Sequence, residues 1–191
     1  MIYALVDQET LNQKAVSLQA LLEQINLRTI TILQYRNKLG SLVEKKDALR
    51  EIRQCFSGTV IINDTIELID EADGLHLGQE DLCRYSKDQT EAVALVRQKI
   101  GQKIFGLSTH NAAEIEEANR LDIDYIGLGA YRSTGTKRDA KVVGVSLLET
   151  AKLSKHPVAI IGGVRLEDRF EAPIDYQVIG SGLYEGMISL K

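Results

Sequence analysis

Residues 103–128 read KIFGLSTHNAAEIEEANRLDIDYIGL, and this stretch predicts one complete strand–helix–strand unit. Two short apolar runs, Lys103–Leu107 and Tyr125–Leu128, have the length and composition of buried strands. Between them, Ala112–Leu121 carries apolar residues at intervals of three and four, which is typical of a helix with one buried face. Asn111 directly precedes this helix and is a suitable N-cap. We therefore expect two parallel strands joined by a right-handed crossover.

The same alternation of strand and helix extends in both directions from this unit. The further strands expected are Ile2–Val6, Thr29–Leu33, Thr59–Ile62, Gly74–Leu77, Val158–Ile161 and Tyr176–Ile179, and the further helices are Leu11–Ile25, Ser41–Gln54, Lys87–Ile100 and Val145–Leu153. Ser41 and Ser86 are the expected N-caps of two of them. Eight strands in one parallel series predict a closed (β/α)₈ TIM barrel that occupies residues 1–191 as a single compact domain. An open doubly wound sheet is the alternative, but no GxGxxG motif follows the first strand.

The last helices of this barrel are expected to be short or missing. The segment Arg165–Asp175, between the last two strands, contains Pro173 and is too short for a long helix. After the last strand and the glycine turn that follows it, only Glu185–Lys191 are left for a closing helix. We therefore expect another subunit to cover part of the outer wall, which predicts a homodimer.

The composition excludes several classes of protein. With 44% hydrophobic and 26% charged residues, the chain has the composition of a globular protein rather than a disordered one. Its longest apolar stretch, Pro157–Val164, is too short to span a membrane. A net charge of −4 argues against a broad nucleic-acid-binding face, and the spacing of Cys55 and Cys83 matches no zinc or redox motif. These features predict a cytoplasmic protein that acts on small molecules.

Polar and glycine-rich segments follow nearly every expected strand. They are Gln34–Lys38, Asn63–Asp64, Gly78–Asp81, Ser108–His110, Thr134–Lys137, Gly162–Gly163 and Gly180–Gly182. In a parallel barrel the loops after the strands build the ligand site at one rim. The sequence therefore predicts a single site to which most of these loops contribute.

The first rim segments predict a site for a phosphate or diphosphate with a metal ion. In an extended chain Gln34, Arg36 and Lys38 point to the same side, and such an array of donors suits a phosphorylated ligand. Asp64 and Asp81 follow neighbouring strands, and paired carboxylates are ligands that Mg²⁺ accepts. The alternatives are a solvated strand end for the donors and turns or helix caps for the two aspartates.

The later rim segments predict a second phosphate site. Thr134, Gly135, Thr136 and Lys137 offer hydroxyls, backbone N–H groups and an ammonium in one loop. The glycine turns after the last two strands could hold a phosphate on backbone amides, as barrels frequently do, although ordinary tight turns would look the same. His110 could transfer a proton, but a histidine before a helix is more commonly a structural donor.

Six motifs in this order resemble the thiamine phosphate synthase family, whose members are small (β/α)₈ barrels. They are QYRNK, IINDT, GLHLGQED, GLSTH, STGTK and IIGGV, and together they span most of the chain. The resemblance implies a Mg²⁺-dependent transferase that joins a hydroxymethylpyrimidine diphosphate to a thiazole phosphate with loss of pyrophosphate. The implied mechanism needs no protein nucleophile, because pyrophosphate departs first and the thiazole nitrogen captures the resulting cation.

The resemblance also implies roles for individual residues. The pyrimidine diphosphate would be held by Gln34, Tyr35, Arg36, Asn37, Lys38 and Asn63, and Mg²⁺ by Asp64 and Asp81. Ser108 and Lys137 would hold the leaving pyrophosphate, so that Arg36, Lys38, Ser108 and Lys137 form the catalytic set. The thiazole phosphate would be bound by Thr134, Gly135, Thr136, Gly163, Gly180 and Ser181.

The chain departs from the family pattern at several positions. The interval between Asp64 and Asp81 is shorter than usual, which predicts a short third helix, and Tyr131–Ser133 stand where the family commonly has Phe-Pro. Two alternatives are kept for this reason. One is a related thiazole tautomerase, an isomerase that would use His110, and the other is a non-catalytic barrel that binds a phosphorylated metabolite.

Overall fold

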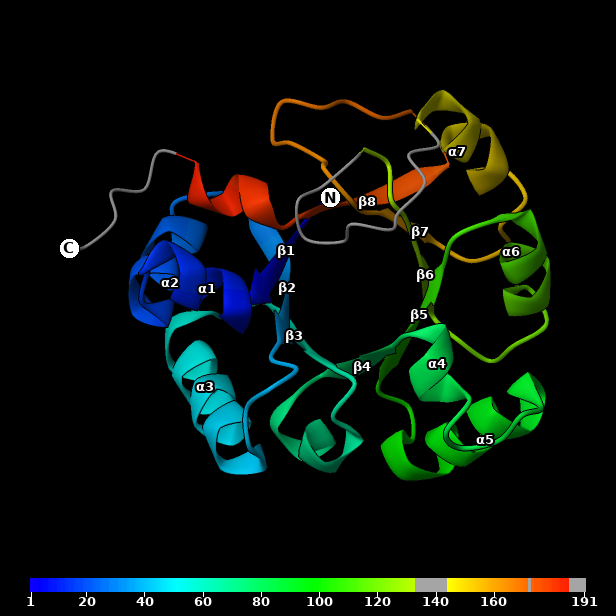
Figure 1. Cartoon of the computed structure of the whole chain (residues 1–191), viewed down its shortest axis with the longest axis horizontal. Coiled ribbons are helices and arrows are strands. Elements are labelled where there is room, and N and C mark those ends of the chain that lie inside the picture. Colours follow the sequence, from blue (N-terminus) through cyan, green and yellow to red (C-terminus); the bar gives the residue numbers. More distant parts are fainter. Residues whose placement is uncertain (133–143, 172, 186–191) are drawn as a thin grey trace.

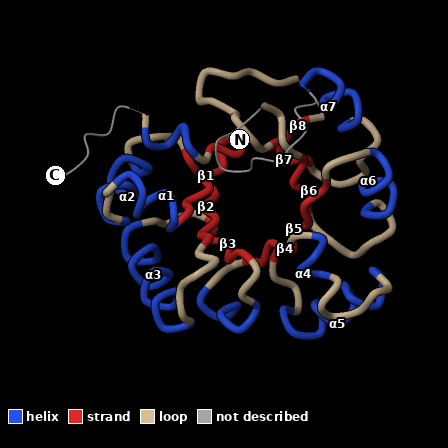
Figure 2. The backbone as a smooth tube through the Cα atoms, in the orientation of Figure 1, coloured by secondary structure: helices blue, strands red, loops and turns tan. Residues whose placement is uncertain are grey.

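A closed barrel of eight parallel strands, with helices around it, is the architecture of the computed structural model (Figure 1, Figure 2). Residues 1–132, 144–171 and 173–185 are described. The strands are β1 (Ile2–Asp7), β2 (Ile30–Arg36), β3 (Thr59–Asn63), β4 (Gly74–Leu77), β5 (Ile104–Thr109), β6 (Tyr125–Leu128), β7 (Val158–Ile160) and β8 (Ile174–Ile179). Each pairs with the next in sequence, and β8 pairs with β1. The predicted (β/α)₈ fold is confirmed.

Strand side chains alternate between the barrel interior and the layer beneath the helices. Tyr3 and Tyr125 lie on strands that are not neighbours, yet their hydroxyls are 2.8 Å apart, so both rings point into the interior. Ile61 and Val178 pack in the same interior cluster. The intervening strand residues belong to the larger core between sheet and helices, as the two-residue period of a strand requires.

The helices are α1 (Gln8–Lys14), α2 (Leu18–Asn26), α3 (Leu42–Cys55), α4 (Gln79–Leu82), α5 (Gln89–Ile100), α6 (Ala112–Ala118) and α7 (Gly144–Ala151), with 3₁₀ helices η1 (Ile66–Glu71) and η2 (Ser181–Tyr184). Two predicted N-caps are confirmed. Ser41 Oγ accepts from the backbone N–H of Glu44, whose carboxylate accepts from the Ser41 N–H. Asn111 Oδ1 accepts from the N–H of Glu114 at 3.0 Å. Among the described residues, every helix is too short or too polar to span a bilayer.

Two details of the predicted helices were wrong. The single helix expected at Leu11–Ile25 is two helices, because Ala15 ends α1 in the left-handed conformation (φ 51°) and Ser17 caps α2. A left-handed alanine leaves no mark in the hydrophobic pattern, which continues across the break. Ser86 is not the N-cap of α5, since Asp88 holds that position and accepts from the Glu91 N–H at 2.9 Å. A carboxylate at this end is also favoured by the helix dipole.

The short outer wall expected near the last strands is present. Between β7 and β8 the described residues, 161–171 and 173, form a loop with no helix, drawn in orange in Figure 1. After β8 comes only the single turn η2 among the described residues. The connection after β3 is likewise reduced to η1, so the shortened third helix is confirmed as well.

Several strands run further toward the rim than predicted. β2 continues to Arg36, so Gln34, Tyr35 and Arg36 belong to the strand and not to the loop after it. β3 includes Asn63, and β5 includes Ser108. Polar side chains in these positions have their backbone fixed by the parallel ladder, which holds them more rigidly than a loop would.

Candidate active site

Two carboxylates, Asp64 and Asp81, meet at the rim between β3 and β4. Asp64 directly follows β3 and adopts the left-handed conformation (φ 60°), with its N–H bonded to the carbonyl of His76 at 3.0 Å. Asp81 lies on the short helix α4, which follows β4. Burial first and then the neighbouring Asp81 raise the pKa of Asp64, whereas the positive charge of Lys38 opposes this shift. The structure therefore brings the two predicted metal ligands into one electrostatic unit.

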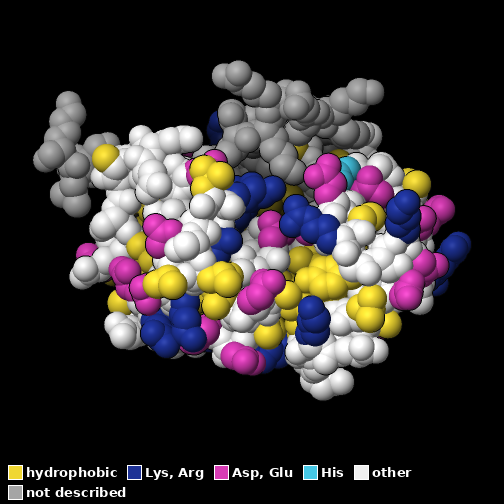
Figure 3. Space-filling model, turned by 60° about the horizontal axis from the view of Figure 1, so that its bottom comes forward, with side chains coloured by type: hydrophobic (Ala, Val, Ile, Leu, Met, Phe, Trp, Pro, Cys, Tyr) yellow, Lys and Arg dark blue, Asp and Glu magenta, His cyan; other side chains and the backbone are white. Residues whose placement is uncertain are grey.

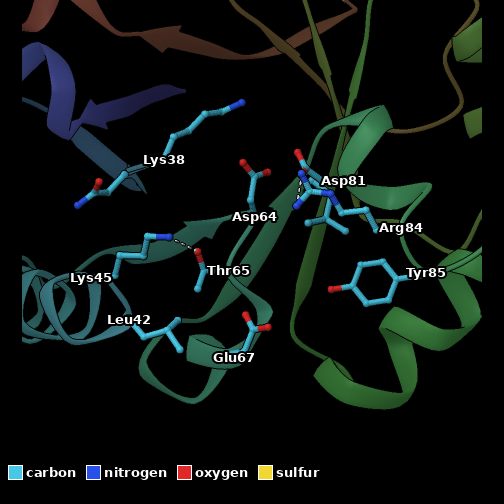
Figure 4. Close-up of a pocket in the computed structure, with 11 residues that line it drawn as sticks. Lys38, Leu42, Lys45, Asp64, Thr65, Glu67, Asp81, Arg84 and Tyr85 are labelled. Carbon is cyan, nitrogen blue, oxygen red and sulfur yellow. Dashed lines mark hydrogen bonds and ion pairs between the residues drawn. The ribbon is translucent and has the colours of Figure 1, made fainter. Parts of the chain in front are cut away.

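A pocket of about 500 Å³ opens beside this pair. It is lined by Asn37, Lys38, Leu42, Lys45, Asp64, Thr65, Glu67, Leu77, Asp81, Arg84 and Tyr85. In Figure 4, Lys38 and Arg84 approach the aspartates from opposite sides, and Arg84 Nη1 lies 3.1 Å from Asp81 Oδ1. Figure 3 shows Lys and Arg side chains beside Asp and Glu side chains around a hollow on this face. Such a mixed lining suits an anion that binds together with a cation.

The donor array predicted at Gln34, Arg36 and Lys38 is divided among three places. Gln34 is buried in the barrel interior, where its amide bonds Tyr3 and Asn63. Arg36 forms an ion pair with the buried carboxylate of Asp7 at the end of β1. Lys38 is exposed and lines the pocket. The expectation that all three long side chains form one array was therefore wrong, because Tyr3 and Asn63 hold Gln34 in the interior and Asp7 holds Arg36.

Tyr35 and Asn37 have structural partners in this region. Tyr35 is only 1% exposed, faces the helical layer and donates from its hydroxyl to Gln8 Oε1 at 2.9 Å. It follows that Tyr35 does not reach the rim site, since it points opposite to its neighbours in the strand. Asn37 Oδ1 accepts from the N–H of Gly40 at 2.8 Å, which stabilises the turn, while the residue also lines the pocket.

Ser108 and Asn63 point from their strands toward the barrel interior. Ser108 Oγ lies 2.9 Å from Nε2 of His76, and the backbone carbonyl of Ser108 accepts from Gln79 at 2.7 Å. Asn63 Oδ1 accepts from Gln34 Nε2 at 2.6 Å. These residues form the floor beneath the rim.

The glycine turn after β7 is tied to the loop after β6. Gly162 and Gly163 have positive φ angles of 94° and 65°. The guanidinium of Arg132 donates to the Gly163 carbonyl at 2.8 Å and forms a two-pronged ion pair with Asp168. This pair holds two rim loops together.

Other residues predicted for the second phosphate site are placed less completely. Gly180 directly precedes η2, and Ser181 is exposed on it. Thr134, Gly135, Thr136 and Lys137 lie outside the described residues, so the structure places none of them. His110, the residue of the tautomerase alternative, is exposed, and its Nδ1 lies 2.9 Å from Glu114 Oε2.

Sequence reasoning missed several residues of the site. Lys45, Glu67, Arg84 and Tyr85 line the pocket from elements that follow the rim loops. Their positions depend on how α3, η1 and α4 pack, and no local pattern marks them. Asp7, the partner of Arg36, could have been found, because an acidic residue directly after an apolar strand lies at the rim by the same rule as the others.

The residues present fit a magnesium ion. Among the described residues, no group of three or more His, Cys, Asp or Glu side chains is arranged to hold a metal on its own. Mg²⁺, however, is commonly held by one or two carboxylates together with substrate phosphates and water. The adjacent carboxylates of Asp64 and Asp81 provide such a pair, and burial together with their mutual repulsion raises the pKa of Asp64.

Comparisons with known proteins place the chain in a family. The family model described as thiamine monophosphate synthase matches residues 2–176. A thiamine-phosphate synthase from Persephonella marina is 34% identical over 170 residues, which cover 85% of this chain and 76% of that protein. One from Clostridium acetobutylicum is 31% identical over 98% of this chain and 87% of its own length. One from Methanosarcina mazei is 40% identical over 72% of this chain, but that match covers only 56% of the relative.

A solved structure agrees with the fold. The thiamine phosphate pyrophosphorylase from Pyrococcus furiosus superposes with a TM-score of 0.73 at 22% identity, covering 94% of this chain and 85% of that one. At this level of identity the likeness supports the barrel architecture alone. The family resemblance expected from the six sequence motifs is confirmed by the family model and by the curated relatives.

Proposed function

The chain belongs to the thiamine monophosphate synthase family, and on this premise we propose that it is the transferase that forms thiamine phosphate. In this reaction a hydroxymethylpyrimidine diphosphate loses pyrophosphate, and the thiazole nitrogen of a thiazole phosphate forms the new C–N bond. The observation that carries the proposal is the carboxylate pair Asp64 and Asp81 beside Lys38 in a rim pocket. This pair suits a diphosphate only when a cation lies between them.

Charge arithmetic explains why the cation is needed. A carboxylate at about 4 Å from a phosphate charge opposes its binding by about 4 kcal/mol at an effective dielectric of about 20. Two such carboxylates without a cation would exclude a diphosphate from the pocket. Asp64 and Asp81 would hold Mg²⁺, which when bound neutralises charge on the leaving diphosphate.

The chain's own residues orient the substrate and receive the leaving group. Lys38 contributes a movable ammonium at the pocket, and Arg36 is positioned by Asp7 at the end of β1. Ser108 places a hydroxyl at the floor of the rim. By the family resemblance Lys137 completes the set. Catalysis by this arrangement is electrostatic and positional, since bond cleavage requires no nucleophile from the protein.

The second substrate binds in our proposal at the later rim loops. Gly163, Gly180 and Ser181 would present backbone and hydroxyl donors to the thiazole phosphate, together with Thr134, Gly135 and Thr136. The bond between Arg132 and the Gly163 carbonyl supports this assignment, because it holds the glycine turn against the loop that leads to these threonines.

We further propose that the protein works in the cytoplasm as a homodimer. The free thiols of Cys55 and Cys83 suit a reducing compartment. A second subunit would cover the outer wall between β7 and β8, where the described residues form only a loop. Sedimentation equilibrium at micromolar concentration tests the dimer, and a single monomeric species would contradict it.

The experiment that tests the proposed reaction is a coupled synthesis. Purified protein with Mg²⁺ and both substrates should form thiamine phosphate and pyrophosphate in equal amounts, and removal of Mg²⁺ with a chelator should stop both. Isomerisation of the thiazole with no coupling would favour a tautomerase instead. Binding of the phosphorylated substrates without any product would favour a non-catalytic barrel.

A further inference from the structure

Five hydrogen bonds form a continuous chain across the barrel interior, from β3 to β5. In order they join Asn63 Oδ1 to Gln34 Nε2 (2.6 Å), Gln34 Oε1 to the Tyr3 hydroxyl (2.7 Å), Tyr3 to the Tyr125 hydroxyl (2.8 Å), Tyr125 to His76 Nδ1 (2.9 Å) and His76 Nε2 to Ser108 Oγ (2.9 Å). The proposed function uses Ser108 at one end of this series, and the family resemblance implies substrate contacts for Gln34 and Asn63 at the other end. Neither assigns a role to the three members in the middle.

The direction of every bond follows from one amide. Gln34 donates to Asn63, so its carbonyl oxygen accepts the single hydroxyl proton of Tyr3. Tyr3 can then only accept from Tyr125. Burial raises the pKa of both tyrosines, so each keeps its proton and has only one to give.

The same counting of protons determines which nitrogen of His76 is protonated. Tyr125 uses its only hydroxyl proton to donate to Tyr3, so the oxygen of Tyr125 must accept from Nδ1–H of His76. In a ring that carries this one proton, Nε2 is an acceptor, and Ser108 donates its hydroxyl proton to it. In this direction the hydroxyl of Ser108 has no proton left for an anion at the rim.

The opposite direction is chemically equivalent. If the amides of Gln34 and Asn63 both turn over, every bond of the chain reverses, and His76 carries its proton on Nε2. Ser108 then accepts from His76, and its own hydroxyl proton is free to point at a ligand. The two arrangements contain the same number of protons and the same charge, so the chain can exist in either direction.

We propose that this chain is a two-state element in which an anion that accepts from Ser108 selects the reversed direction. His76, Tyr125 and Tyr3 are then positioning residues that couple the pyrophosphate end of the site to the amides of Gln34 and Asn63. The inference deepens the proposed function and rests on it for the identity of the anion, the leaving pyrophosphate. The direction of the hydrogen bonds in the protein without ligand does not depend on the proposed function.

Nitrogen-15 NMR of the imidazole rings tests the proposal directly. His110→Gln and His156→Gln variants assign the signals of His76. Without ligand, Nδ1 of His76 should carry the proton, and saturation with inorganic pyrophosphate and Mg²⁺ should move it to Nε2. A His76 ring protonated on Nε2 without ligand, or one that does not respond while calorimetry shows pyrophosphate bound, would overturn the proposal.

Two matched tyrosine variants distinguish the effect of these hydrogen bonds from the effect of ring packing. Tyr125→Phe keeps the ring but removes both hydrogen bonds of the Tyr125 hydroxyl, so His76 should no longer respond to pyrophosphate, and kcat should fall about 10-fold or more, as expected for the loss of these two bonds. Tyr176→Phe alters a ring that packs edge-on against both Tyr3 and Tyr125 but is not a member of the chain, and it should keep the wild-type response. If Tyr125→Phe does not fold, Tyr3→Phe breaks the next link with the same expected result.

The outcomes distinguish this inference from the proposed function. A pyrophosphate response that persists in Tyr125→Phe would overturn the coupling even if synthesis proceeds normally. Absence of pyrophosphate binding in calorimetry would overturn the coupling and the proposed function together. In that case the position of the His76 proton without ligand would still decide whether the chain has the direction inferred here.

Discussion

Asp64 and Asp81 act on each other across the gap between β3 and β4, and the pKa of Asp64 is raised by its burial and by this neighbour. The two residues are distant in sequence. They lie close together because β3 and β4 are parallel neighbours whose ends reach the same rim. Two carboxylates side by side repel each other when no ligand is bound. A cation such as Mg²⁺ held between them would remove this repulsion, which is the role that we propose for the pair.

Replacing Asp64 separates its functional role from its structural cost. Asp64→Asn keeps a residue type that tolerates a positive φ, but it removes one metal ligand, so kcat should fall by about 100-fold or more as several kcal/mol of charge stabilisation are lost. Steady-state synthesis assays with Mg²⁺ measure this. Activity within a few-fold of wild type would show that the pair does not hold the metal.

The same variant should change stability with a defined pH dependence. Because the pKa of Asp64 is raised in the folded protein, its stabilising contribution is full below the unfolded pKa and is lost as the pH rises through the folded pKa. Asp64→Asn should therefore unfold at higher urea concentration than wild type at pH 7, with no difference at pH 3. A variant less stable than wild type at pH 7 would contradict this sign.

Lys38 should contribute to binding of the diphosphate through its charge. Lys38→Ala should raise the KM for the pyrimidine diphosphate about 10-fold or more, the loss expected for a hydrogen bond to a charged group. Lys46→Ala is the matched control, because Lys46 pairs at 2.9 Å with Glu71 away from the pocket lining. The control should change stability little, because the pair is solvent-exposed, and it should leave KM unchanged. Equal effects of the two variants would rule out a specific role for Lys38.

The ion pair between Arg132 and Asp168 should stabilise the two rim loops above acidic pH. Hydrogen bonds from Arg132 lower the pKa of Asp168, so this stabilisation is present above the unfolded pKa and is lost as the pH falls through the folded value. Asp168→Asn should cost about 1 kcal/mol at pH 7, the upper end for a solvent-accessible pair, and less at pH 2–3. Urea titrations at both pH values measure the difference, and a cost that does not shrink in acid would refute the assignment.

Two glycines with positive φ provide a matched test of the β7 turn. At Gly162 (φ 94°) an added Cβ would lie 2.6 Å from Cβ of Ala130, whereas at Gly101 (φ 60°) it would meet nothing within 4 Å. Gly162→Ala should destabilise the protein by about 2–4 kcal/mol, through strain and overlap, and Gly101→Ala by about 1–2 kcal/mol, through strain alone. Thermal unfolding compares them. Equal losses would mean that the turn relaxes around the added methyl group.

The barrel and its rim could be predicted from sequence because both follow from short-range patterns. Strand runs such as Tyr125–Leu128 and capped helices such as the one after Ser41 are marked locally, and the parallel topology then places every following loop at one end. Asp64 and Asp81 were found in this way. The rule needs only the order of elements along the chain.

The features of the site that the sequence did not predict depend on where each strand ends and on which side of the sheet each side chain lies. Gln34 and Arg36 were expected in a loop, but β2 includes them, and this sends Gln34 to the interior and Tyr35 to the helical layer. The interior chain through Tyr3 and His76 joins strands that are distant in sequence. Such contacts depend on the register of the closed barrel, which a single sequence does not specify.

Closure of the barrel by β8 on β1 makes the final step of assembly depend on two strands that lie more than 160 residues apart in the sequence, Ile2–Asp7 and Ile174–Ile179. During synthesis on the ribosome, the backbone N–H and C=O groups on one edge of β1 have no partner strand until Ile174–Ile179 have been synthesised. An exposed edge of this kind can recruit a strand from another nascent molecule. Variants that weaken β8 should therefore lower the yield of soluble protein in the cell before they lower the activity of the molecules that do fold.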